Sequence, residues 1–138
     1  MYLIDTNTVS EARKGKRANP GVIRFFESLA TSGDPAYLSA ISVGEFRRGI
    51  ELVRRRGDDK QAELLEEWLT AVLSEFRDKI LSFDADAAQI WGRLRVPDPA
   101  HELDKQIAAI ALVYDLTVVT RNIGDFVGTG VKSMNPFT

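Results

Sequence analysis

The sequence contains no cysteine, and it has no long hydrophobic run. Without cysteine, disulfide bonds and thiolate zinc sites are excluded, and a reducing compartment is compatible with the chain. The longest apolar run, Ile107 to Tyr114, has eight residues, whereas a membrane-spanning helix needs about 20. Asp5 interrupts the first apolar stretch too early for a secretory signal. We therefore expect a soluble, cytoplasmic protein that has no membrane partner.

The chain also lacks a large excess of either charge. It has 18 Lys and Arg residues and 20 Asp and Glu residues, which gives a net charge of −2. The chain as a whole is therefore no electrostatic attractor for nucleic acid. Two local basic clusters stand out, Arg13 to Arg17 and Arg54 to Arg56. Each cluster alone is typical of a solvated helix end. A role in binding phosphate is indicated only where a phosphate-processing site lies close by.

Histidine is almost absent, because His101 is the only one in the chain. It lies just after Pro97-Asp98-Pro99, in a loop that proline bounds on one side. We interpret it as a solvated loop residue and a poor candidate for a catalytic base.

Short apolar segments alternate with helical patterns, and no repeat or linker divides the chain. We expect one domain over residues 1–138. The expected strands are Met1–Ile4, Ala36–Ser39, Ile80–Phe83, Leu116–Val119 and a last short one near Val131–Met134. The expected helices start at Thr6, cover Val22–Ala30, follow Ser42, cover Lys60–Phe76, follow Asp84 and cover Glu102–Tyr114. Strands separated by helices predict an α/β fold of three α/β/α layers around a short parallel sheet.

Two local patterns bear on particular helices. Ser42 followed by Glu45 matches a capping box, in which Ser42 is the N-cap and Glu45 closes the box. The stripe Leu65, Leu69, Val72 and Phe76 has helical spacing. It fits ordinary core and a partly exposed interaction face equally well.

Acidic residues follow the predicted strands or begin the predicted helices. In "MYLIDTN", Asp5 ends a buried strand, and ligands of open parallel sheets bind beyond the carboxyl ends of the strands. Asp104 shares the inward face of its helix with Ile107 and Ala111. Asp104 and Glu45 are each also explained as helix caps or partners of the helix dipole. Asp125, in "TRNIGDF", is a fourth acid of this kind.

Together these acids suggest chemistry that none of them suggests alone. Clustered carboxylates repel one another unless a cation neutralises them. Oxygen ligands suit Mg²⁺ or Mn²⁺. Such a site fits phosphodiester hydrolysis, because a bound metal polarises the phosphate and activates water.

Four segments in order, "LIDTN", "LSAISVGEFRRGI", "LDKQIAAIAL" and "VVTRNIGDF" followed by "VKSMNPF", resemble the PIN-domain ribonucleases, and among them the VapC-type toxins. The resemblance implies a PIN-like fold and an Mg²⁺- or Mn²⁺-dependent endoribonuclease acting on RNA. It also implies a homodimer and a cognate VapB-like antitoxin. The loop "RVPDPAHEL" departs from the shorter lead-in typical of the family.

Carried over by position, the resemblance assigns Asp5, Glu45 and Asp104 as metal ligands and catalytic residues. The fourth catalytic position falls on Asp125 or near Asn122, and both stay open. Supporting roles fall to Thr6, Asn7, Thr120 and Asn122. For RNA binding we expect Arg13, Lys14, Lys16, Arg17 and Arg121.

Two other functions stay open at this stage. "DTNTV" roughly matches the opening motif of haloacid-dehalogenase-like phosphatases, in which Asp5 would be a nucleophile. That motif needs a second acid where this chain has Asn7. The other alternative is a non-catalytic binding module whose acids are structural. Retention of Asp5, Glu45 and Asp104 argues against it.

Overall fold

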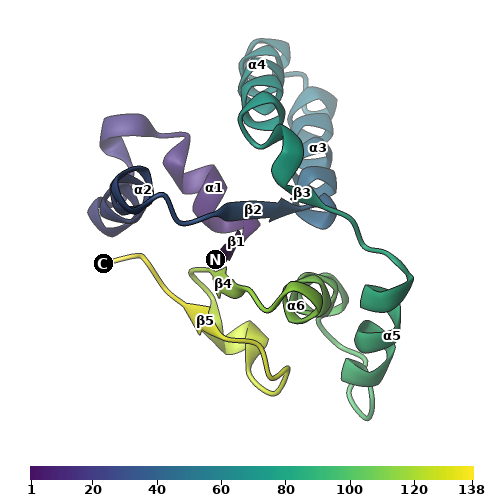
Figure 1. Ribbon diagram of the computed structural model, residues 1–138. Coiled ribbons are helices and arrows are strands. Elements are labelled where there is room, and N and C mark those ends of the chain that lie inside the picture. Colours follow the sequence, from purple (N-terminus) through teal and green to yellow (C-terminus); the bar gives the residue numbers. More distant parts are fainter.

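A computed structural model describes residues 1–138. Its centre is a five-stranded sheet in the order β3-β2-β1-β4-β5, and every neighbouring pair is parallel. The strands are β1 (Tyr2–Ile4), β2 (Ala36–Ser39), β3 (Ile80–Leu81), β4 (Thr117–Val119) and β5 (Ser133–Met134). The first strand lies in the middle, between β2 and the late strand β4 (Figure 1).

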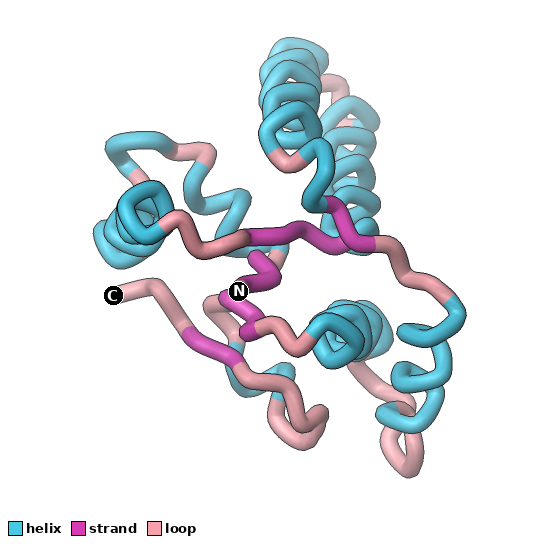
Figure 2. Tube along the Cα trace, in the orientation of Figure 1, coloured by secondary structure: helices cyan, strands magenta, loops and turns pink.

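Six α-helices connect the strands, as Figure 2 shows. They are α1 (Thr6–Ala12), α2 (Pro20–Ser32), α3 (Ala40–Arg55), α4 (Asp59–Glu75), α5 (Ala85–Leu94) and α6 (Glu102–Tyr114). Three 3₁₀ turns complete the chain: η1 (Gly15–Arg17), η2 (Arg77–Lys79) and η3 (Ile123–Phe126). None of the helices combines the length and the apolar character that crossing a bilayer requires.

Helices cover both faces of the sheet, which makes the three-layer α/β/α fold that the sequence predicts. Neighbouring residues of a strand point to opposite faces. Leu3 and Val118 therefore pack with the buried residues of α6, whereas Ile4 and Val119 pack with residues of α1 to α4. Because both faces are covered, the central strands β1 and β4 are mostly apolar.

All five strands and six helices predicted from the sequence are present, with shifts of a few residues at most at their ends. The predicted N-cap at Ser42 is wrong. The N-cap of α3 is Ser39, whose hydroxyl accepts a hydrogen bond from the Ser42 backbone N–H at 3.0 Å. The helix therefore begins three residues earlier, and Glu45 lies in its second turn. Glu45 therefore closes no capping box at this helix start. Its carboxylate faces another element.

Helices α3 and α4 form a hairpin that extends away from the sheet (Figure 1). Within the α4 stripe, Leu69 and Val72 are buried, and Leu65 and Phe76 pack against the same core at partial exposure. Beside the stripe, Trp68 meets Phe46 of α3 edge-on, with ring centroids 5.0 Å apart. The stripe is therefore core at its centre, and its two ends are partly accessible.

Candidate active site

Asp5 is the most deeply placed acid of the chain, with 5% of its surface exposed. It follows β1 and is the N-cap of α1, where its Oδ1 accepts a hydrogen bond from the Thr6 N–H at 2.8 Å. Its Oδ2 accepts from Thr120 Oγ1 at 2.8 Å and from Asn7 Nδ2 at 3.3 Å. Strand β1 thus delivers a carboxylate to the carboxyl edge of the sheet, and three polar groups fix its orientation.

The supporting polar residues form a network of their own across the β1–β4 junction. Asn7 Oδ1 accepts from the backbone N–H of Arg121 at 3.0 Å. Thr120 Oγ1 accepts from the backbone N–H of Asn122 at 3.0 Å. The side chain of Asn122 is exposed. Three predicted supporting residues, Asn7, Thr120 and Asn122, therefore meet in this network, and Asn122 joins it through its backbone.

Glu45 reaches the same edge from α3. Its Oε1 accepts a hydrogen bond from Thr6 Oγ1 at 2.8 Å, and Ser42 Oγ lies 2.9 Å from that same hydroxyl. Thr6 therefore touches two of the predicted ligands, Asp5 through its backbone and Glu45 through its side chain.

The other two acids form a second group opposite the first. Asp104 lies in the first turn of α6 and Asp125 lies in η3, and both are half-buried. His101 joins them, since its Nδ1 lies 3.7 Å from Asp104 Oδ2. One ligand atom each of His101, Asp104 and Asp125 lie within 4.8 Å of one another. Of the two candidates for the fourth position, it is Asp125 whose carboxylate lies close to Asp104.

Our interpretation of His101 as a solvated loop residue is incomplete. Its ring is 53% exposed, but it lies against a predicted ligand. The sequence carries a signal for this, because His101 and Asp104 are three residues apart at a helix start, a spacing that places side chains on one face.

Burial and mutual repulsion act together on these carboxyls. The pKa of Asp104 is raised to about 6, first by burial and then by the negative charges of Asp5, Asp125 and Glu45. Burial also raises the pKa of Asp5, partly offset by its hydrogen bonds from Thr120 and Thr6. The pKa of Glu45 is raised by burial and by the charge of Asp5. The four acids thus share one electrostatic field, and a half-buried set of repelling oxygens fits a hard divalent cation.

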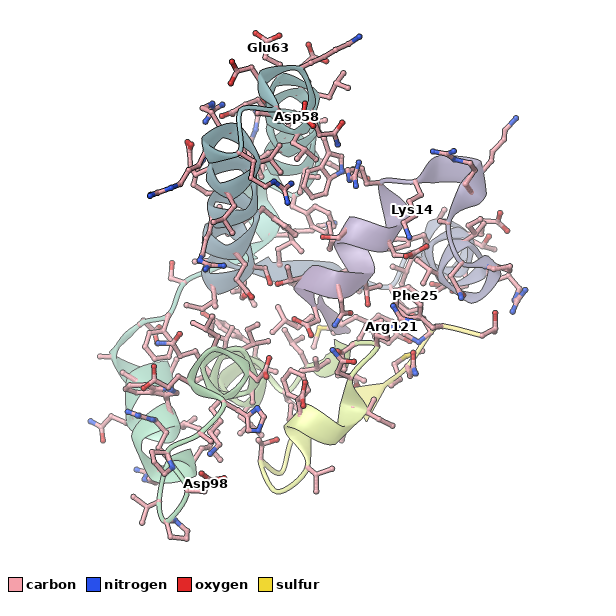
Figure 3. The ribbon with its side chains drawn as sticks, turned by 180° about the vertical axis from the view of Figure 1, so that it is seen from behind. Lys14, Phe25, Asp58, Glu63, Asp98 and Arg121 are labelled. Atoms are coloured by element: carbon pink, nitrogen blue, oxygen red, sulfur yellow. The ribbon has the colours of Figure 1, made fainter.

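Some of the predicted RNA-binding residues border this edge. Arg13 lines a cavity of about 270 Å³ that Thr6 and Glu45 also line. Arg121 follows β4 and stacks its guanidinium over Phe137, 5.2 Å from the ring centroid. Figure 3 shows Arg121 and Lys14 on the side of the molecule that carries α1, whereas Asp58 lies on the α3–α4 hairpin.

The basic residues differ in how their charge is already engaged. Lys14 pairs with Glu11 at 2.8 Å, whereas Lys16 and Arg17 are exposed in η1 and form no ion pair. In the second cluster, Arg54 pairs with both Glu51 and Glu66. The charge of Arg54 is therefore largely matched within the hairpin.

Comparison with known proteins adds independent evidence. Residues 2–127 match the PIN domain family. The chain is 35% identical to Toxin FitB of Neisseria gonorrhoeae over 143 aligned positions that cover 99% of both proteins. It is 28% identical to VapC ribonuclease Y4jK of Sinorhizobium fredii, covering 99% of this chain and 98% of that protein.

The fold comparison agrees. A chain in a solved structure of FitAB bound to an IR36 DNA fragment matches with a TM-score of 0.84 and 33% identity. That match covers all of this chain and 96% of the other. The chain therefore belongs to the PIN-domain family.

Proposed function

We propose that the protein is an Mg²⁺- or Mn²⁺-dependent endoribonuclease and the toxin of a toxin–antitoxin pair. The observation that carries the proposal is the convergence of Asp5, Glu45, Asp104 and Asp125 at the carboxyl edge of the sheet in a PIN-domain chain. The name of the relative Y4jK supports ribonuclease activity, and the name of FitB supports the toxin role. A cytoplasmic location follows from this role, since RNA is the substrate.

In this function the four carboxylates would hold the cation, which would supply Lewis-acid chemistry for phosphodiester hydrolysis. Thr6 and Thr120 keep the Asp5 carboxylate in one orientation through its two oxygens. Thr6 also holds Glu45, so the spacing of these two acids is set before a cation binds. Asp104 and Asp125 would complete the set of carboxylates. The exposed cations Arg13, Lys16, Arg17 and Arg121 offset the negative field for the RNA backbone.

The partners follow from the same site. FitB is a toxin by name, and the matched chain occurs in a FitAB structure. We infer that this chain binds a VapB-like antitoxin and forms a homodimer. An antitoxin that blocks the acids should present Arg or Lys, because these side chains pair with carboxylates.

The phosphatase alternative lacks its second acid in the structure as well. The position that would hold a general acid is Asn7, whose amide donates to Asp5 and accepts from the Arg121 N–H. Family membership also disfavours it. A non-catalytic module is disfavoured because all four acids of the site are present.

RNA cleavage by the purified chain tests the proposal. Wild type should cleave RNA with Mg²⁺ or Mn²⁺ and stop with EDTA, and Asp104→Asn should lose the activity. Asp34→Asn is a matched control, because it changes an exposed carboxyl just after α2. This variant should cleave RNA like wild type. Equal cleavage by Asp104→Asn and wild type, prepared identically, would refute the proposal. If wild type cleaves RNA and Asp104→Asn does not, sequencing the RNA ends would identify the substrate.

A further inference from the structure

We propose that His101 is a direct nitrogen ligand that completes a cation site with Asp104 and Asp125, and that it shifts the preference of this site from Mg²⁺ toward Mn²⁺. The proposal rests on the acidic site of the proposed function and adds a ligand that the resemblance does not supply. Its starting point is the close approach of His101, Asp104 and Asp125, which each offer one ligand atom within 4.8 Å of the others.

The grouping of the ligands places His101 with two of the four acids. Asp5 and Glu45 are tied together by Thr6, whereas Asp104 and Asp125 face His101. Three different positions supply the second group: the residue before α6, the first turn of α6 and the turn η3. An ion at this point meets one nitrogen and carboxylate oxygens from two separate elements.

The loop that carries His101 is held against the helices at several points. Lys105 is buried, and its Nζ donates to the carbonyl of Asp98 at 2.5 Å. Trp91 Nε1 of α5 donates to the carbonyl of Glu102 at 3.2 Å, and Arg95 pairs with the Glu102 carboxylate at 2.8 Å. These contacts fix the backbone on both sides of His101, so the residue is placed near the acids before any ion binds.

Apart from its contact with Asp104, the ring of His101 makes no hydrogen bond or ion pair. His101 is the residue before α6, yet its side chain makes no capping hydrogen bond. Its backbone is in the left-handed region at φ 58°, which a residue with a side chain adopts rarely. Its ring has Asp104 as its one charged neighbour within salt-bridge distance.

Space for water lies beside two of the three proposed ligands. A cavity of about 430 Å³ is lined by His101 and Asp125, together with Lys105, Asp98 and Thr129. Water or a phosphate oxygen in this cavity would fill the positions that three protein ligands leave free on an octahedral ion.

Ligand chemistry sets the expected preference. Mg²⁺ takes oxygen ligands and gives up its water reluctantly, whereas imidazole suits transition ions. A site of two carboxylates and one imidazole should therefore bind Mn²⁺ more tightly than Mg²⁺, and removing the imidazole should reduce that ratio.

The decisive measurement is pulsed electron paramagnetic resonance of bound Mn²⁺, which detects a directly coordinated nitrogen. Because His101 is the only histidine in the chain, ¹⁵N-histidine labels this site alone when the protein carries no histidine tag. We expect a ¹⁴N coupling in unlabelled protein, a ¹⁵N coupling in labelled protein, and neither in His101→Gly. Glycine is chosen because it accepts the left-handed backbone without strain.

Binding affinities give the second measurement. In His101→Gly the dissociation constant for Mn²⁺ should rise by about 10-fold or more, the scale of losing a ligand-shell contact, and that for Mg²⁺ should change much less. Asp34→Asn is the control: it removes one exposed negative charge that belongs to neither group of ligands, and its Mn²⁺ to Mg²⁺ ratio should equal that of wild type.

Absence of a nitrogen coupling in the labelled wild-type protein would overturn the proposal without reliance on any variant. The same protein is assayed for RNA cleavage with Mn²⁺. Cleavage without a nitrogen coupling refutes the role of His101 and leaves the proposed function standing. A nitrogen coupling without cleavage supports the site and refutes the nuclease.

Discussion

The side chain of Thr6 donates a 2.8 Å hydrogen bond to Glu45 across the gap between α1 and α3. The same residue donates its backbone N–H to Asp5. Asp5 and Glu45, which are 40 positions apart in the sequence, are therefore both hydrogen-bonded to Thr6. The distance between the two carboxylates depends on this residue.

Replacing this link should impair catalysis more than folding. Thr6→Val keeps the volume and removes the hydroxyl, so Glu45 loses a hydrogen bond of the kind worth about 1.5–3 kcal/mol to a charged group. We expect kcat/KM for RNA cleavage to fall by roughly 10-fold or more. Thr31→Val, at an exposed position of α2, is the control. Wild-type cleavage by Thr6→Val would show that the position of Glu45 is set elsewhere.

Without metal, stability should fall as pH rises, because of Asp104. Its pKa is about 6 in the folded state against an ordinary 3.8. The folded protein therefore holds more protons than the unfolded chain between about pH 4 and 6, and its stability decreases through that window. Asp104→Asn removes this loss of stability, because asparagine carries no charge at any of these pH values.

In EDTA the variant Asp104→Asn should melt a few degrees above wild type at pH 7, and the difference should shrink toward pH 4. Thermal melts across that range test this. Adding Mn²⁺ should raise the Tm of wild type more than that of the variant, because only wild type keeps the full ligand set. A Tm difference that does not vary with pH would contradict the repulsion argument.

RNA affinity should depend on Arg121 and not on Arg54. Arg121 is exposed beside the Asp5 network, whereas Arg54 already pairs with Glu51 and Glu66. In an inactive Asp5→Asn background, Arg121→Ala should weaken binding of RNA and lower the salt slope by roughly 0.7. Affinity over a salt series measures both. The opposite result, with Arg54→Ala alone affecting the slope, would place the RNA on the α3–α4 hairpin.

Two glycines should respond in opposite directions to alanine. A Cβ on Gly21 would lie 2.0 Å from the carbonyl oxygen of Pro136, so Gly21→Ala must displace the C-terminal segment and lower the Tm. A Cβ on Gly49 meets nothing within 4 Å, and in a helix interior alanine is favoured by about 1 kcal/mol. Gly49→Ala should therefore raise the Tm. Denaturation of both variants checks this, and equal effects would show that the tail does not pack as described.

The sequence predicted the layers and the strands well because apolar runs and helical periodicity are local signals. It missed the start of α3, since Ser39 and Ser42 are both plausible caps and the choice depends on where β2 ends. It listed Asp5, Glu45, Asp104 and Asp125, but it did not reveal that Thr6 joins the first two or that His101 faces the last two. Those relations depend on contacts between elements, which no local pattern records.

The place of β4 in the sheet has a consequence for synthesis on the ribosome. Val119 accepts the backbone N–H of Asp5 at 2.9 Å, and Thr120 orients its carboxylate. Thr120 lies 115 positions after Asp5 in the sequence, so it is made long after β1. A nascent chain that ends before β4 lacks the neighbour of its central strand and leaves Asp5 without these partners. The Asp5 side of the acidic site is therefore completed only after β4 has joined the sheet.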